Sequence, residues 1–274
     1  LEKKKNVKTF FGSELSKIDS KNSFSKIYLK NKIITSKLII AADGKNSKVR
    51  DFFNNKIYKK KYSDSALVLN FQHEHDLKST AYEIFYDTGP LAILPMKSQK
   101  NFFQSSIIWS NKDIFTKNLI NCNEKFIKHI VNEKVSNIVG NITKINSIQK
   151  FPLSAHINDS FYNKRLVYIG DAAHSIHPIA GQGWNLGIKD IKNIYFLCKV
   201  ITSQKIEIGD DAFCKKYNSL SYKNAFQLFQ ITDKLNLHFK IQKNIYRKIS
   251  NLGFNFIQNN QNTKERITKY AMGL

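Results

Sequence analysis

The segment from Arg165 to Gly187 constrains the fold of this chain more than any other part of the sequence. It begins with a short apolar run, Leu166–Ile169, which is typical of a strand buried inside a sheet. Asp171 stands at the carboxyl end of that strand, and small residues, a proline and a Gly-x-Gly sequence lead from there into a helical pattern. Because such a strand needs helices to cover it, we expect an α/β fold, or α+β when the whole chain is considered.

The same segment has the residue types of a binding site. A carboxylate at a strand tip can accept hydrogen bonds from ribose or ribityl hydroxyls, and ligands of open sheets lie beyond the strand ends. Alanines allow a flat cofactor to approach the backbone, and glycines leave the N–H groups of a first helical turn free to face an anion. An ordinary strand–loop–helix connection is the alternative. The candidate cofactor-binding residues here are Gly170, Asp171, Ala172, Pro178, Gly181, Gln182, Gly183 and Asn185.

Two groups of histidines raise the question of a metal. Asp171, His174 and His177 are spaced three apart, but Pro178 argues against a helix at this point and no fourth ligand is evident. His73 and His75 lie on one side of an expected strand, and we interpret both as surface residues. No metal site is predicted.

A second motif lies between Leu38 and Arg50. The run Leu38–Ala42 is apolar without alternation, and Asp43-Gly44 follows it. Asp-Gly alone is a common hairpin turn. Together with Ser47 and Arg50 it instead resembles a helix start that carries a hydroxyl and a guanidinium, which suits a pyrophosphate. Asp43, Gly44 and Arg50 are therefore candidate cofactor-binding residues.

Between these motifs the sequence predicts an antiparallel sheet. Short apolar or alternating runs, separated by turn residues, occupy residues 66–71, 81–86, 91–95 and 102–109, with a turn expected at 88–90. A single helix is expected to follow from Asn111 or Asp113. A substrate pocket under this sheet would include residues around Phe85, Leu94 and Trp109, although aromatic strand residues usually belong to the core.

Two helical patterns follow Gly181. The first has a core-facing stripe of Gly187, Ile191, Ile194, Cys198 and Ile201. The second, a long helix or a helical pair, begins near Asp211, and its apolar stripe includes Tyr217, Leu228, Ile231 and Leu235.

The composition excludes several function classes. The formal net charge is +23, but only four of the 44 basic residues are arginines, which phosphate-reading surfaces favour, so we expect no nucleic-acid partner. Three scattered cysteines predict reduced thiols and a cytoplasmic protein rather than a disulfide framework. No apolar run approaches the roughly 18 residues of a membrane-spanning helix.

The motifs resemble a known family. AADGKNSKVR resembles the DG motif, and IGDAAHSIHPIAGQGWNLGIKD the GD motif, of the FAD-dependent aromatic hydroxylases, which are similar to p-hydroxybenzoate hydroxylase. The pieces GPLAILPM, SSIIW, FPLSAHI and AMGL are similar to the ubiquinone-biosynthesis hydroxylases of that family, such as 2-octaprenyl-6-methoxyphenol hydroxylase. The resemblance extends over nearly the whole chain, with Trp184 in place of an expected Leu or Phe.

One departure concerns the amino terminus. The family begins with a strand and a GxGxxG loop for the FAD pyrophosphate, whereas Gly181, Gly183 and Gly187 form only GxGxxxG and the chain starts at Leu1. The resemblance therefore implies an N-terminally truncated chain, an incomplete fragment whose Rossmann-like FAD/NAD(P)-binding domain lacks its first part. Such a fragment would bind FAD weakly or not at all.

The resemblance also implies a division of the chain and a role for each part. Residues 1–55, with the DG motif, and 151–204, with the GD motif, would belong to the FAD-binding domain, residues 56–150 to an antiparallel-sheet substrate domain, and residues 205–274 to a C-terminal helical region. Asp171 would hold the ribityl chain, the backbone from Gly181 to Asn185 the flavin ring, and Asp43 with Arg50 the phosphates of FAD or of the nicotinamide cofactor.

The implied activity is hydroxylation of a polyprenyl phenol in ubiquinone biosynthesis, with FAD as cofactor and NAD(P)H and O2 as co-substrates. No side chain is required as a nucleophile, so no catalytic residue is named. An insoluble substrate implies peripheral association with the inner membrane face or with a biosynthetic complex, for which the helices after Asp211 could provide the dock. The alternatives are a hydroxylase of another substrate, a reductase or a halogenase of the same fold, and a basic binding module without catalysis.

Overall fold

The computed structural model describes residues 4–99, 102–179, 181–201, 207–240 and 244–272, which form two compact units. The first unit comprises Leu1–Tyr58, His156–Ser175 and Gly183–Leu228, and the second comprises Lys59–Ala155, Ile176–Gln182 and Phe229–Leu274. Both contain helices and strands, which agrees with the expected mixed fold. The division into four functional segments remains a prediction.

The first unit contains two small sheets. One is an antiparallel meander in the order β1-β2-β3, and the other has the order β10-β11-β4. Strand β3 was not expected from the sequence. The bounds are β1 Leu15–Ser20, β2 Ser25–Leu29, β3 Lys32–Ser36, β4 Ile39–Ala41, β10 Tyr162–Asn163 and β11 Leu166–Tyr168.

Strands β4 and β11 pair in parallel, with Ile40 opposite Val167, so the two motif strands are neighbours. This confirms the parallel arrangement expected of an α/β fold. The prediction that β4 is buried on both faces is only half right. Ile39 and Ala41 are buried, whereas the side chain of Ile40 is 47% exposed because successive strand residues point to opposite faces.

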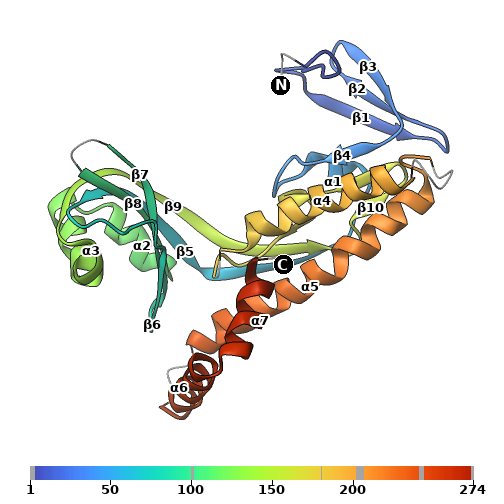
Figure 1. Ribbon diagram of the computed structural model, residues 1–274. Helices are drawn as coiled ribbons and strands as arrows, with labels where there is room; N and C mark the ends of the chain where they lie inside the picture. Colours follow the sequence, from blue (N-terminus) through green and yellow to red (C-terminus); the bar gives the residue numbers. More distant parts are fainter. Residues whose placement is uncertain (1–3, 100–101, 180, 202–206, 241–243, 273–274) are drawn as a thin grey trace. The chain divides into compact units, whose positions relative to one another are not determined.

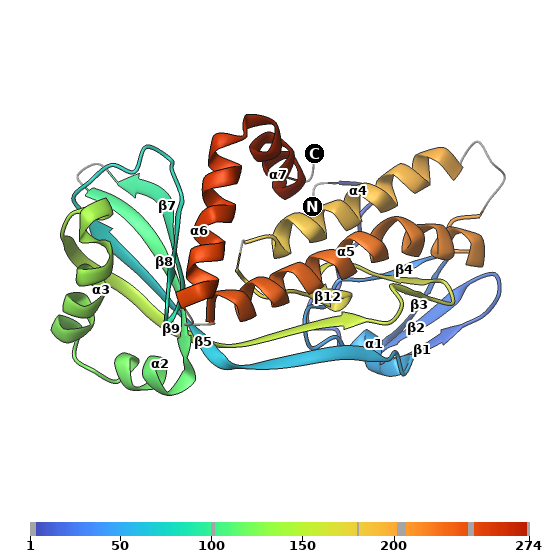
Figure 2. The same cartoon turned by 90° about the horizontal axis from the view of Figure 1, so that it is seen from below.

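Two long helices run side by side in the first unit (Figures 1 and 2), α4 (Gly183–Ile201) and α5 (Asp211–Lys240), of which residues 211–228 belong to this unit. The Asn193 side chain donates to Ser221 Oγ across them at 2.9 Å.

The expected apolar stripes of both helices are partly wrong. Ile191 is exposed, while Leu186, Asp190, Ile194 and Leu197 are buried on α4. On α5, Ile231 and Leu235 are exposed, and the buried residues are Phe213, Cys214, Tyr217, Ser221, Ala225, Phe229, Thr232 and Asn236. Polar residues therefore occupy buried positions that a hydrophobicity pattern cannot identify.

The large sheet has the order β12-β9-β5-β8-β7-β6. Its bounds are β5 Ile57–His73, β6 Tyr82–Tyr86, β7 Gly89–Gln99, β8 Phe102–Lys112, β9 Ile142–Asn158 and β12 His174–Ser175. The antiparallel pairings β5–β8, β7–β8 and β6–β7 confirm the predicted antiparallel sheet. Gly89 and Pro90 begin β7 instead of forming the turn, because the register pairs Tyr86 with Gly89 and leaves a two-residue connection.

Helices cover one face of this sheet. The single expected helix is two helices, α2 (Asp113–Ile120) and α3 (Glu124–Val139), because Asn123 caps a new helix by accepting from the Phe126 N–H at 2.9 Å. Figure 1 shows both helices beside β7 and β8. Inward-facing sheet residues such as Leu69 and Leu91 pack with Val131 and Val135 of α3, and all four are fully buried.

His73 is a correction within this unit. We expected a surface residue, but the side chain is 1% exposed and its Nε2 lies 2.9 Å from Ser105 Oγ of the neighbouring strand. Burial lowers the pKa of the imidazole.

The remaining elements are a short helix α1 (Lys48–Phe52), a turn of 3₁₀ helix η1 (Gly170–Ala172), and the C-terminal helices α6 (Asn244–Asn259) and α7 (Gln261–Met272). Within the described ranges, no helix combines the length and the apolar character needed to span a membrane.

Candidate functional site

The GD motif forms a tight turn directly after β11. Gly170 has a φ of +54° and opens η1, and the space where its Cβ would stand contains no atom within 4 Å. Its N–H donates to Asp190 Oδ2 of α4 at 3.0 Å. The side chain of Asp171, the next residue, is exposed to solvent. The turn thus presents a carboxylate beside open backbone at the carboxyl end of a parallel strand.

Two side chains donate hydrogen bonds to the carbonyl oxygen at the end of this turn. The carbonyl oxygen of Ala172 accepts from Arg50 Nη1 at 3.3 Å and from Asn158 Nδ2 at 3.1 Å. The Ala172 side chain is 0% exposed. Ala172 therefore faces the protein interior, and the expectation that it lets a flat cofactor approach is not supported by its contacts.

The DG motif forms a strand followed by a helix, so the hairpin alternative is wrong. Asp43 Oδ2 accepts from the Val49 N–H at 3.1 Å, and Ser47 Oγ accepts from the Arg50 N–H at 3.0 Å. Both oxygens thus satisfy N–H groups of the first turn of α1. Gly44 has a φ of +82°, and nothing lies within 4 Å of a Cβ built there. Asp43 itself is exposed.

The Arg50 guanidinium forms hydrogen bonds within the protein. Its guanidinium is buried and donates to the Lys45 and Ala172 carbonyl oxygens, at 2.9 and 3.3 Å, while Nη1 lies 3.1 Å from His156 Nε2. It thereby links the DG loop to the GD turn, 122 residues away in sequence. Desolvation and the adjacent positive charges, Arg50 first among them, lower the pKa of His156 to about 4. A phosphate ligand was expected at this position, but the contacts are those of a residue that positions both motifs.

A buried hydrogen bond between two side chains also supports the GD turn. His174 Nε2 and Asp190 Oδ2 are 2.7 Å apart, and both side chains are almost completely buried. Asp190 was not among the site residues predicted from the sequence. A signal was present, since Asp190 lies on the same helical face as Leu186 and Ile194, and a carboxylate on a buried face needs a partner.

The second half of the GD loop, residues 176–182, belongs to the second unit. The Gly181 N–H donates to the Pro178 carbonyl oxygen at 2.9 Å, and Gly181 has a φ of +60° that favours glycine. The buried His177 accepts from the Ile179 N–H and packs edge-on against the Tyr62 ring, with 4.8 Å between centroids. The exposed loop residues are thus supported by a buried histidine.

The helix after this loop begins at Gly183. Gln182 and Gly183 are half-buried, and Asn185 and Trp184 are exposed, the indole at 78%. The first N–H groups of α4 have no partner within the helix itself, which makes its amino end suitable for an anion.

A hollow of about 290 Å³ lies in the second unit between this loop and the sheet face opposite α2 and α3. Its lining consists of Ala81, Tyr82, Glu83, Pro90, Ala92, Leu94, Ile108, Ser110, Pro178, Ile179 and Gly181. The expected Leu94 is among these residues. Trp109 is not, because strand residues alternate and its indole points into the core, where it meets Phe115. Phe85 lies outside the hollow as well.

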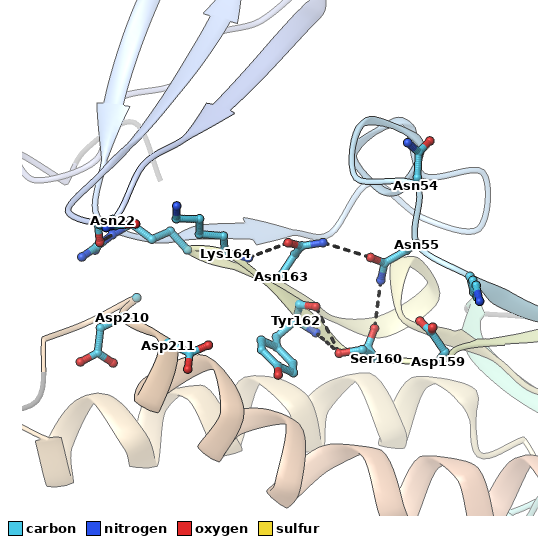
Figure 3. Close-up of a pocket in the computed structure, with 13 residues that line it drawn as sticks. Asn22, Asn54, Asn55, Asp159, Ser160, Tyr162, Asn163, Lys164, Asp210 and Asp211 are labelled. Carbon is cyan, nitrogen blue, oxygen red and sulfur yellow. Dashed lines mark hydrogen bonds between the residues drawn. The ribbon is translucent and has the colours of Figure 1, made fainter.

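A larger, polar hollow of about 780 Å³ lies in the first unit. Figure 3 shows that residues lining it form hydrogen bonds with one another: Asn163 Nδ2 donates to Asn55 Oδ1, and Asn55 Nδ2 donates to the backbone carbonyl oxygen of Ser160. None of the residues that the sequence predicted for the site lines it. We therefore take the GD turn of the first unit as the candidate cofactor site and the smaller hollow of the second unit as the candidate substrate pocket, each within its own unit.

The residues of the GD region fit a flavin nucleotide. In the first unit, Asp171 offers a carboxylate to hydroxyl groups, the bare Cα of Gly170 leaves room that a Cβ would fill, and the amino end of α4 offers N–H donors to an anionic ring edge. This donor set matches the chemistry of a ribityl chain and an isoalloxazine ring.

Comparisons with known proteins also indicate that the chain is an FAD-binding protein. Residues 3–219 match the FAD binding domain family. The chain is 26% identical to Ubiquinone hydroxylase UbiL of Rhodospirillum rubrum over 242 residues, which are 88% of this chain and 55% of that protein. It is 27% identical to 3-demethoxyubiquinol 3-hydroxylase of Escherichia coli, again over 88% of this chain, and covers 61% of that protein.

Among solved structures, p-nitrophenol 4-monooxygenase PnpA of Pseudomonas putida superposes with a TM-score of 0.71 at 14% identity, over 93% of this chain and 64% of that one. This likeness shows a shared fold. The chain spans about half to three fifths of the length of the curated relatives. Because the family match covers most of its residues, the chain belongs to the FAD binding domain family.

Proposed function

We propose that this chain forms the flavin and substrate sites of an FAD-dependent monooxygenase that hydroxylates a polyprenyl phenol in ubiquinone biosynthesis. The proposal takes its substrate class from the names of the relatives, which are ubiquinone hydroxylases. The observation that carries it is the hollow whose walls are the GD loop on one side and an apolar sheet face on the other. Pro178 and Gly181, which line this hollow, belong to the GD motif that is assigned to the flavin.

In this proposal, residues of the two motifs hold FAD. Asp171 accepts hydrogen bonds from the ribityl hydroxyls, and the backbone from Gly181 to Asn185, with Gln182 and Gly183, faces the flavin ring. Asp43 and Gly44 lie near the phosphates, and Arg50 positions the DG and GD turns through the contacts described above. Residues 1–55 and 151–204 then form the FAD-binding part, 56–150 the substrate part and 205–274 a C-terminal helical region.

The flavin, once reduced by NAD(P)H, supplies activation of O2, and the protein supplies binding, orientation and exclusion of water. Pro178 and Ile179 form one wall of the hollow, and Ala92, Leu94 and Ile108 form the other. An apolar enclosure of this kind holds an aromatic ring in one orientation and limits loss of the activated oxygen to water.

A polyprenyl substrate also requires contact with a membrane or a partner complex. Exposed apolar side chains gather on the C-terminal helices, at Ile231, Leu235 and Leu237 of α5 and Leu252, Phe254 and Phe256 of α6. We propose that these residues contact the inner membrane face peripherally, with the lysines of α7 near anionic headgroups. Binding to anionic vesicles should fall when Phe254 and Phe256 are changed to Ser, and it should be unaffected by Phe11→Ser, which alters an exposed phenylalanine of the first unit.

The first test of the proposal is FAD binding by the purified chain, measured by flavin fluorescence. Asp171→Ala should weaken FAD binding about tenfold or more, because hydrogen bonds to a charged acceptor are lost. Asp159→Ala, an exposed aspartate of the same unit that lines the larger hollow, is the matched control. Equal affinity of the Asp171 variant and the wild type would contradict the assigned role.

The second test measures turnover with a short-chain phenol. A monooxygenase consumes NAD(P)H and O2 in step with a product that is heavier by one oxygen atom. NAD(P)H consumption that is independent of phenol would indicate a reductase, and incorporation of chloride would indicate a halogenase.

A further inference from the structure

A carboxylate of α5 contacts strand β5 in the second unit. Lys60 and Tyr62 lie two residues apart on β5, so their side chains point to the same face of the strand. Asp233 binds both of them: its Oδ2 lies 2.6 Å from Lys60 Nζ, and its Oδ1 accepts from the Tyr62 hydroxyl at 3.0 Å. Both oxygens of one carboxylate are therefore used to hold the start of β5 against the helix.

The Tyr62 ring in turn supports the GD loop. It packs edge-on against the imidazole of His177, with 4.8 Å between the ring centroids. His177 is buried, and its Nδ1 accepts from the Ile179 N–H at 3.2 Å. Burial and the hydrogen bond to Asp233 raise the pKa of Tyr62 above its ordinary value, so the hydroxyl stays protonated and remains a donor.

These contacts end at the hollow. Pro178 and Ile179 line it, whereas Tyr62, His177 and Asp233 stand behind its wall. Ile179 is itself 1% exposed, so the protein packed around it determines its position. A continuous series of contacts thus leads from Asp233 through Tyr62 and His177 to a wall of the hollow, and all of these residues belong to the second unit.

We propose that Tyr62 and Asp233 are positioning residues, which fix the Pro178–Ile179 wall through His177 and so prepare the hollow to hold an aromatic ring in one orientation. The inference rests on the proposed function, which places the ring of the substrate in this hollow. A site that is ordered before the ligand arrives binds more tightly, because less conformational freedom is lost on binding.

This role predicts a local effect. Without the Tyr62–Asp233 hydrogen bond, the loop should open more often, and the Ile179 amide should exchange with solvent at least about threefold faster. Binding of a phenol should weaken by a similar factor. A merely structural role would instead lower the protection of all core amides together, including those of Leu69 and Val131 in the sheet core.

The first measurement is amide hydrogen exchange by NMR on the full chain without ligand. Asp233→Ala and Tyr62→Phe should each accelerate exchange at Ile179 and leave Leu69 and Val131 unchanged. The double variant should be no faster than either single variant, because both changes remove the same hydrogen bond. Tyr62→Leu, which also removes the ring from His177, should have the largest effect.

The matched controls lose comparable contacts elsewhere in the second unit. Asp113→Ala removes an aspartate whose Oδ1 lies 2.8 Å from Lys150 Nζ, and Tyr86→Phe removes a hydroxyl that donates to the Lys134 carbonyl oxygen at 2.8 Å. Neither Asp113 nor Tyr86 lines the hollow, and both variants should exchange at Ile179 as the wild type does.

The second measurement is titration of the full chain with 4-propylphenol in the presence of FAD, by calorimetry. Asp233→Ala and Tyr62→Phe should weaken binding at least about threefold, and the two controls should bind as the wild type does.

The outcomes separate the inference from the proposed function. Unchanged exchange at Ile179 in the Tyr62 and Asp233 variants, or faster exchange with unchanged binding of the phenol, would overturn the positioning role. If the wild type did not bind 4-propylphenol, the proposed substrate site would fail, while the exchange data, which need no ligand, would still decide whether Tyr62 and Asp233 hold the loop. Should Tyr62→Leu not fold, Tyr62→Phe, which keeps the ring, decides the question.

Discussion

His156 makes the stability of this chain depend on pH between about 4 and 6.5. The imidazole is 2% exposed at the end of β9, and Arg50, Lys45 and His174 all act against its protonation. Its pKa is lowered to about 4 in the folded chain, whereas an imidazole in the unfolded chain titrates near 6.5. The unfolded state therefore takes up a proton first as the pH falls, and it is stabilised relative to the folded state.

The magnitude follows from the two pKa values. At pH 7.5 both states are neutral at this site, so its contribution to stability is fully present. At pH 4.5 the unfolded state is almost entirely protonated and the folded state only partly, which lowers the free energy of unfolding by about 2–3 kcal/mol. Below pH 4 the folded state is protonated as well, and the loss approaches a limit of about 3 kcal/mol.

Urea unfolding at pH 7.5 and pH 4.5 would measure this loss. His156→Gln has no titrating group at this position, so its stability should fall by about 2–3 kcal/mol less than that of the wild type over the same interval. His75→Gln, which changes an exposed histidine, is the control and should show the wild-type dependence. Identical pH dependence of the wild type and the His156 variant would refute the reasoning.

Three substitutions test other parts of the structure by urea unfolding and FAD titration. Asp190→Ala removes the buried acceptor of the Gly170 N–H, and it should cost about 1–3 kcal/mol for each donor left without a partner and should weaken FAD binding; unchanged FAD affinity would show that the GD turn does not need this support. Gly89→Ala would place a Cβ 2.2 Å from the Ser110 carbonyl oxygen at a φ of +140°, so it should both destabilise the chain and weaken binding of phenols. Leu91→Ala empties a fully buried position of the sheet core and should cost about 2–5 kcal/mol without altering FAD affinity; a loss below about 1 kcal/mol would contradict the packing described above.

The local structure of the two motifs could be predicted because its signals are close together in sequence. The strand, the aspartate and the helix start of both motifs are adjacent in sequence, and their turns depend on glycine conformations and on caps within a few residues, as for Ser47 and Asp43. The antiparallel sheet could be predicted for the same reason, because short turns join strands that are neighbours in sequence and have an alternating pattern. These features need no knowledge of distant parts of the chain.

The sequence is less informative where a residue's contacts depend on distant parts of the chain. Arg50 has the charge that suits a phosphate, and its role toward the cofactor stays a prediction, but only the structure shows that His156 and Ala172, more than a hundred residues away, lie within hydrogen-bond distance of its guanidinium. His73 looked like a surface residue because nothing nearby in sequence shows that Ser105 lies opposite it. A single sequence contains no information about such pairs beyond residue type.

The sequence by itself determined the class of fold, the two cofactor motifs and the family that they resemble, because these depend on short runs of residue types with fixed spacing. Only the tertiary structure decided which side of each strand forms the hollow. A strand pattern alternates, so it shows that Ile108 and Trp109 face opposite ways but not which of them faces the core. The helices that cover one face of the sheet decide this. Trp109 lies on the covered face and belongs to the core, whereas Glu83, Ala92 and Ile108 lie on the opposite face beside the GD loop.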